Sequence, residues 1–101
     1  MANTYKTVMT EVATTGSDVD VFTAPSGGCI VRNVMIYAKG SGTATVKYDD
    51  RTTDAAINQA TLTTDEMWEP FSSPLGMLSA HIISVNTSVA VNVLITYVEF
   101  S

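Results

Sequence analysis

The chain has 101 residues and a mass of 10.8 kDa, which suits a single domain, residues 1–101, with one modest core. It contains 15 Thr, 12 Val and 6 Ile against 4 Leu, and this excess of β-branched residues favours strands over helices. The formal net charge is −5, and the five basic residues are scattered singly, which argues against nucleic acid and against an anionic membrane surface as partners. No apolar run approaches the roughly 20 residues of a transmembrane helix.

Turn-forming residues recur every 8 to 14 residues, a spacing typical of a β-sandwich or barrel. In the first half we expect strands at 4–13, 19–23, 29–38 and 43–48. In strand 29–38, Ile30, Arg32, Val34 and Ile36 should share one face, and Val31, Met35 and Tyr37 the other. Apolar residues on both faces indicate a central strand, or one covered by a second protein surface. Residues 39–42 should form a hairpin turn, after which Ala44, Val46 and Tyr48 point inward.

The second half starts with a polar loop, 49–54, and a weaker strand, 56–62. Residues 63–66 resemble the start of a helix, but Pro70 stops it within about a turn, so an irregular segment is expected there. Strands are then expected at 77–85 and 89–100. The alternation of 89–100 places Val91, Val93 and Ile95 on one face. Together these elements predict an all-β fold: a single antiparallel β-sandwich of jelly-roll or immunoglobulin-like type.

Few residues suggest chemistry. Cys29 is the only cysteine, so no internal disulfide can form, and His81 is the only histidine, at the start of an apolar strand. The acidic cluster Asp49, Asp50 and Asp54 does not match the spacing of a calcium loop and is interpreted as a solvated loop. We therefore predict no catalytic residue, no metal site and no cofactor, and hence no enzyme. The N-terminus lacks the pattern of a secretory signal.

The most informative cluster consists of Met67, Trp68 and Phe71. These three large apolar residues stand in the irregular segment beside Glu66, Glu69 and Pro70. One interpretation is a plug that closes the open end of the sandwich. The other is a contact with another subunit or partner, since interfaces are enriched in these residue types. We take Met67, Trp68 and Phe71 as the predicted interface residues.

Several segments together resemble small virion proteins of tailed bacteriophages. They are Val21 to Gly28 (Val-Phe-Thr-Ala-Pro-Ser-Gly-Gly), Val31-Arg32-Asn33, the Gly40-Ser41-Gly42 turn, the strand up to Tyr48, the Pro74-Leu75 step, and Val91 to Glu99. The resemblance covers most of the chain, roughly Val19 to Phe100. Ser79-Ala80-His81 stands where such proteins often carry Gly-Asp. The resemblance implies a non-enzymatic component of a phage particle.

From this we expect a capsid decoration (cement) protein that binds the assembled capsid lattice and stabilises it. Its partners would be the major capsid protein, or another virion protein, and its own copies in a homo-oligomer such as a trimer. Its location would be the virion, after synthesis in the host cytoplasm. Two alternatives remain open: a neck, tail or fibre accessory protein of the virion, and a module that binds host glycans with Trp68 or Tyr48 as stacking platforms.

Overall fold

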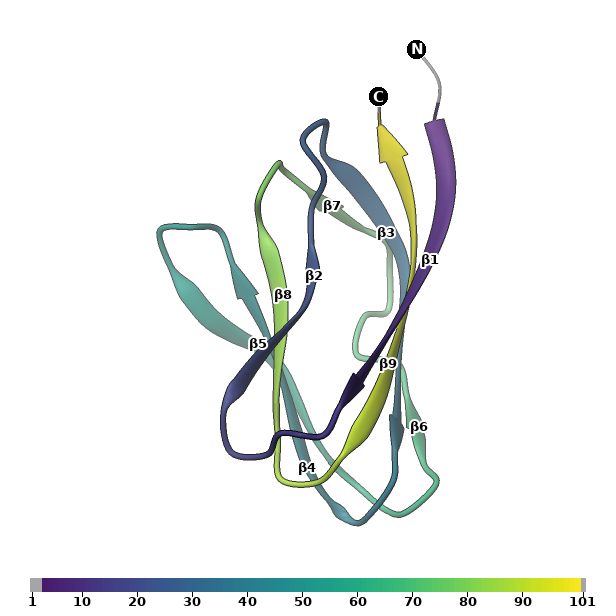
Figure 1. Ribbon diagram of the computed structural model, residues 1–101, viewed down its shortest axis with the longest axis vertical. Helices are drawn as coiled ribbons and strands as arrows, with labels where there is room; N and C mark the ends of the chain where they lie inside the picture. The colour runs from purple at the N-terminus through teal and green to yellow at the C-terminus, as the bar shows by residue number, and fades with distance from the viewer. Residues whose placement is uncertain (1–2, 101) are drawn as a thin grey trace.

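The computed structural model describes residues 3–100, and the secondary structure within this range consists of β-strands. The strands are β1 (Asn3–Val12), β2 (Asp18–Thr23), β3 (Cys29–Ala38), β4 (Gly42–Asp49), β5 (Asp54–Leu62), β6 (Met67–Trp68), β7 (Leu75–Met77), β8 (Ile82–Thr87) and β9 (Val91–Phe100). They form two antiparallel sheets that pack face to face (Figure 1). Sheet A has the order β1-β9-β3-β6, with β7 also paired to β3, and sheet B has the order β2-β8-β4-β5. The predicted all-β sandwich is confirmed.

The strands pair in a nested pattern that distinguishes between the two expected topologies. β1 pairs with β9, β2 with β8, β3 with β6 and β7, and β4 with β5, and successive pairs alternate between the two sheets. This nesting is that of a jelly roll in which β6 and β7 together occupy the place of one strand. An immunoglobulin sandwich would instead place the first two strands side by side in one sheet.

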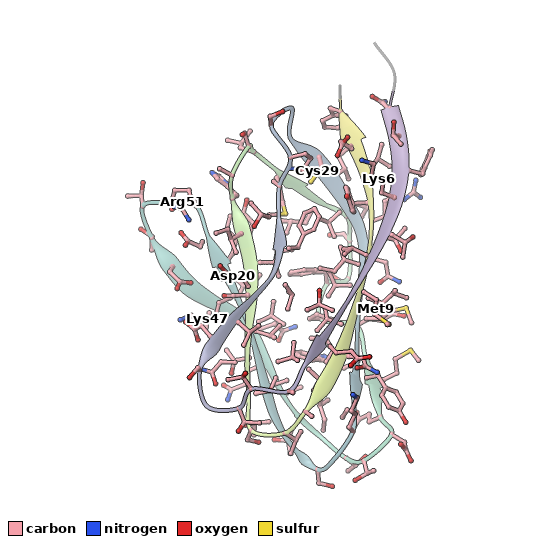
Figure 2. All side chains as sticks on the ribbon, in the orientation of Figure 1. Lys6, Met9, Asp20, Cys29, Lys47 and Arg51 are labelled. Atoms are coloured by element: carbon pink, nitrogen blue, oxygen red, sulfur yellow. The ribbon has the colours of Figure 1, made fainter. Side chains whose placement is uncertain are left out.

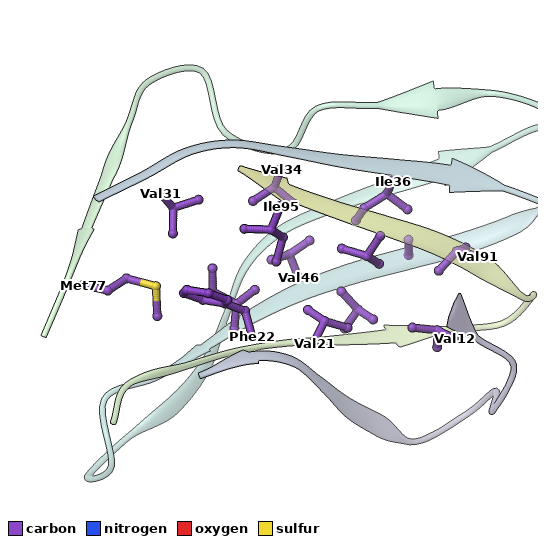
Figure 3. Packing of buried hydrophobic residues seen from close by; sticks show 14 of the residues in the cluster. Val12, Val21, Phe22, Val31, Val34, Ile36, Val46, Met77, Val91 and Ile95 are labelled. Carbon is purple, nitrogen blue, oxygen red and sulfur yellow. The ribbon is translucent and has the colours of Figure 1, made fainter. Parts of the chain in front are cut away.

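One hydrophobic core lies between the sheets (Figure 3). Alternating residues of β9 supply its centre, with Val91, Val93 and Ile95 at most 1% exposed. Ala44 and Val46 of β4 face them from sheet B and are fully buried. Tyr48 packs against the same cluster. The inward faces expected for these two strands are therefore confirmed, and strict alternation is the reason, because successive side chains of a strand point to opposite sides.

The faces expected for β3 were wrong over its first half. The register of β3 against β9 shifts between Val31 and Asn33, so Arg32 lies in a β-bulge. The extra residue reverses the alternation, so Val31 is buried with Val34, while Ile30 is 38% exposed. From Asn33 onward the alternation follows the expected pattern, with Ile36 inward and Met35 outward.

The turn at residues 39–42 is not a hairpin, because β3 lies in sheet A and β4 in sheet B. It is a crossover at one end of the sandwich. The backbone at Gly42 passes close to Ser88 there, and a Cβ at this position would overlap Ser88 Oγ. A similar constraint acts at the other end, where a Cβ at Gly27 would overlap the carbonyl oxygen of Phe100.

Two further segments differ from expectation. The strand expected at 77–85 is split into β7 and β8, because the chain turns between them: the His81 N–H donates to the Leu78 carbonyl at 3.2 Å, and Ala80 has φ +68°. After 63–66 an irregular segment was expected, and the difference is the two-residue strand β6 (Met67–Trp68). The Glu66 carboxylate accepts the Thr63 N–H at 2.9 Å, as in a helix cap, but β6 follows at once and pairs with β3.

Candidate docking surface

The outer face of sheet A, which points away from sheet B, carries several large apolar side chains. Within residues 3–100, six large hydrophobic residues are exposed, and four of them lie on this face: Tyr5, Met9, Ile30 and Met67. Met9 is 59% exposed, and Figure 2 shows its side chain on the side of the sheet away from the core. Large contiguous apolar patches on soluble proteins commonly mark interaction sites.

The strand register explains how part of this face becomes a groove. Met9 of β1, Leu94 of β9 and Met35 of β3 lie opposite one another in a single row across the sheet. The next row on the same face contains Asn92, Tyr37 and Met67. These six residues line an open hollow of about 190 Å³, which we call the methionine groove. Three flexible thioether side chains make it an adaptable apolar surface.

Two polar groups lie in the methionine groove. The Asn92 Oδ1 atom is buried and has no hydrogen-bond partner within the described part of the chain. The Tyr37 hydroxyl donates a hydrogen bond to Asp65 Oδ1. This bond raises the pKa of Tyr37, because the negative Asp65 stabilises the neutral phenol, and it fixes the ring along one wall of the groove.

A second hollow lies at the opposite end of the same face. It has a volume of about 430 Å³, and its lining includes Tyr5, Ile30, Val98 and Phe100. Tyr5, Val98 and Ile30 form another row across β1, β9 and β3. A polar row with Thr7, Thr96 and Asn33 separates the two hollows. The face therefore offers an apolar groove at one end, a hydrogen-bonding strip in the middle, and at the other end a mixed hollow whose lining also includes Arg32 and Asn3.

The structure separates the three predicted interface residues. Met67 lies on the outer face and is 56% exposed. Trp68, its neighbour on the two-residue strand β6, points to the other side and packs against the core, as does Phe71. Within this one segment, Met67 is therefore exposed on the outer face, whereas Trp68 and Phe71 pack against the core.

Sequence reasoning did not include Met9, Met35 and Leu94 in the candidate site. The apolar character of both faces of β3 and β9 was the signal that could have revealed them. Because these residues come from strands far apart in the chain, only the register of β1, β9 and β3 brings them together.

The residues considered for chemistry have structural partners. His81 Nδ1 lies 2.7 Å from the Tyr48 hydroxyl, and the two rings meet edge to face. Burial raises the pKa of Tyr48. Asp50 Oδ1 accepts the backbone N–H groups of Thr52 and Thr53, which lowers the pKa of Asp50 and closes the tip of the β4–β5 hairpin. The Tyr48 side chain packs against the core, and its ring also contacts His81. Only part of the ring is therefore left for stacking on a ligand.

The other two carboxylates of this loop also have partners. Asp49 Oδ1 accepts the Arg51 N–H at 2.7 Å, and Asp54 lies 3.5 Å from Lys47 Nζ. Residues 3–100 contain no group of three or more His, Cys, Asp or Glu side chains arranged to hold a metal ion. Over the same residues there is no helix of the length and apolar character needed to cross a membrane.

The chain matches no protein-family model and no curated protein.

Proposed function

We propose that this protein is a non-enzymatic structural component of a tailed-phage particle, a decoration protein that binds the assembled capsid through the outer face of sheet A. The observation that carries the proposal is the methionine groove, an apolar surface with an unpaired buried acceptor on the outer face of sheet A. The resemblance of the sequence to phage virion proteins supports the choice of a virion protein as the partner. The major capsid protein, or a neighbouring virion protein, would cover the face.

Adhesion is the mechanism. Burial of Met9, Met35, Met67 and Leu94 would provide the hydrophobic free energy, and the polar row between the two hollows would set the register of binding. Because the complementary site would exist only on assembled capsomers, binding would favour the lattice over free subunits by mass action. At a free concentration about 100 times the dissociation constant, each bound copy would add about 2.7 kcal/mol to lattice stability.

The test is retention on capsids built from the major capsid protein encoded with this chain. Wild-type protein should co-sediment with them, and Met9→Asp and Met67→Asp should not. Both side chains are more than half exposed, so the variants should fold normally. Leu78→Asp is the matched control, because Leu78 is 71% exposed on the turn between β7 and β8 and does not line the methionine groove.

Electron microscopy of the particles provides the second readout. Density at every capsomer junction is the expected result. Density confined to a vertex or the tail would replace the decoration role with the neck or tail alternative. Equal retention of wild-type and both Asp variants would show that the outer face of sheet A is not the docking surface.

A further inference from the structure

The larger hollow on the outer face of sheet A contains an arginine, and we call it the Arg32 hollow. Tyr5, Ile30, Val98 and Phe100 supply its apolar walls. Within the described part of the chain, Arg32 is the only charged residue in the lining. A guanidinium group beside apolar side chains suits a ligand that carries a carboxylate next to an apolar group, because the planar fork of N–H donors matches the two carboxylate oxygens.

The bulge in β3 is the reason that Arg32 lies in this hollow. Asn33 is on the outer face in the row with Thr96, so regular alternation would turn residue 32 toward the core. The register shift between Val31 and Asn33 instead makes Arg32 the extra residue, and its side chain reaches the outer hollow. The local backbone therefore directs the guanidinium onto the face that the proposed function assigns to a partner.

Arg32 has no carboxylate partner within residues 3–100, although the chain has ten acidic residues against five basic ones. Glu99 lies between two residues of the hollow in sequence, but it pairs with Lys6 at 3.2 Å. In the strand register Glu99 lies opposite the buried Cys29, so it belongs to the inner side of sheet A. The guanidinium is therefore available for a carboxylate from outside the chain.

The negative charges of the outer face lie at its other end. Glu11 follows Met9 by two residues on β1 and is directly opposite Asn92 of the methionine groove. Asp65 accepts the hydrogen bond from Tyr37 at the same groove. A carboxylate of a partner would be repelled at the methionine groove and attracted at the Arg32 hollow, so the charges of this face select the end that receives it.

We propose that the partner docked on the outer face of sheet A presents an acidic side chain, flanked by an apolar residue, to the Arg32 hollow. The carboxylate accepts two N–H groups of the guanidinium, and the apolar neighbour packs against Tyr5, Ile30 and Phe100. This inference rests on the proposed docking function and adds the chemistry that the partner must carry at one end of the contact.

The first experiment uses the free protein and needs no capsid. The probe is the peptide N-acetyl-Leu-Glu-Leu-amide, and N-acetyl-Leu-Gln-Leu-amide is its uncharged counterpart. In NMR titrations at low ionic strength, the glutamate peptide should shift the Nε–H signal of Arg32 and bind about fivefold more tightly than the glutamine peptide. Added salt should reduce this preference, because dissolved ions screen an exposed charge pair.

Variants at Arg32 test whether the preference arises there. Arg32→Gln should bind the two peptides equally, and Arg32→Lys should keep only part of the preference, because an ammonium group lacks the guanidinium fork. Lys39→Gln is the matched control: it removes the same charge from an exposed residue that follows β3, makes no ion pair within residues 3–100 and does not line the hollow. Lys39→Gln should bind like wild type. Because both side chains are exposed, all three variants should melt like wild type.

The second experiment is capsid retention. Arg32→Glu should weaken retention about tenfold, and Lys39→Glu, with the same change of charge, should not. A wild-type protein that is not retained would refute the proposed function, and the peptide titrations would still decide whether the hollow selects a carboxylate. Equal binding of the two peptides by wild type, an Arg32→Gln variant that keeps the preference, or retention of Arg32→Glu equal to wild type would each overturn the inference.

Discussion

Trp68→Ala should destabilise the folded protein and leave capsid retention of the folded fraction unchanged. Removal of a fully buried Trp side chain costs about 3–5 kcal/mol. Trp68 is only partly buried, at the edge of sheet A, but it packs against the core, so a loss somewhat below that range, about 2–3 kcal/mol, is expected. For a domain of this size that loss corresponds to a fall in melting temperature of roughly 10–20 °C.

The assay is thermal and urea unfolding followed by circular dichroism, at a concentration where the protein is monomeric. Met67→Ala is the matched control, since Met67 is the adjacent residue on the same short strand and points to the opposite side of the sheet. It should change stability by no more than about 0.5 kcal/mol and should weaken capsid retention instead. If Trp68→Ala unfolds like wild type but loses retention, Trp68 is a contact residue and its assignment to the core is wrong.

Three further predictions concern the fold. Gly27→Ala should cost about 1–3 kcal/mol in urea unfolding, because its Cβ would collide with a main-chain oxygen of β9, whereas Gly76→Ala, with open space around it, should not show this loss. Ala80→Gly should raise stability by about 0.5 kcal/mol in the same assay, because φ +68° is strained for alanine, and an unchanged midpoint would contradict this. Hydrogen bonds from Lys47 and Asn86 lower the pKa of Asp18, so its stabilising contribution is present above the ordinary pKa of 3.8 and disappears as pH falls through the lower folded value. Asp18→Asn should therefore be less stable than wild type at neutral pH, and the difference should vanish in acid titrations; a difference that persists there would show another cause.

The sequence predicted much of the fold because period-two alternation is a local property. The bounds of β3 match the expected strand, and the inward residues of β4 and β9 follow directly from alternation. The predicted inward and outward faces of β3 were wrong before the bulge at Arg32. The extra residue there moves every preceding side chain of the strand to the opposite face of the sheet. The turn at residues 78–81 was missed because alanine is not a typical residue for positive φ.

The candidate site was only partly predictable. The irregular segment with Met67 was identified from composition, but the sequence could not show that Met67 and Trp68 belong to opposite sides of the sheet.

By itself, the sequence determined an all-β chain with a core of alternating aliphatic residues. The alternation of apolar and polar residues along each strand is a local pattern, and it is enough to predict which face of the strand is buried. The tertiary structure decided which strands are neighbours, and this depends on pairings between residues far apart, such as Met9 with Leu94 and Met35 with Leu94. The methionine groove exists only through those pairings.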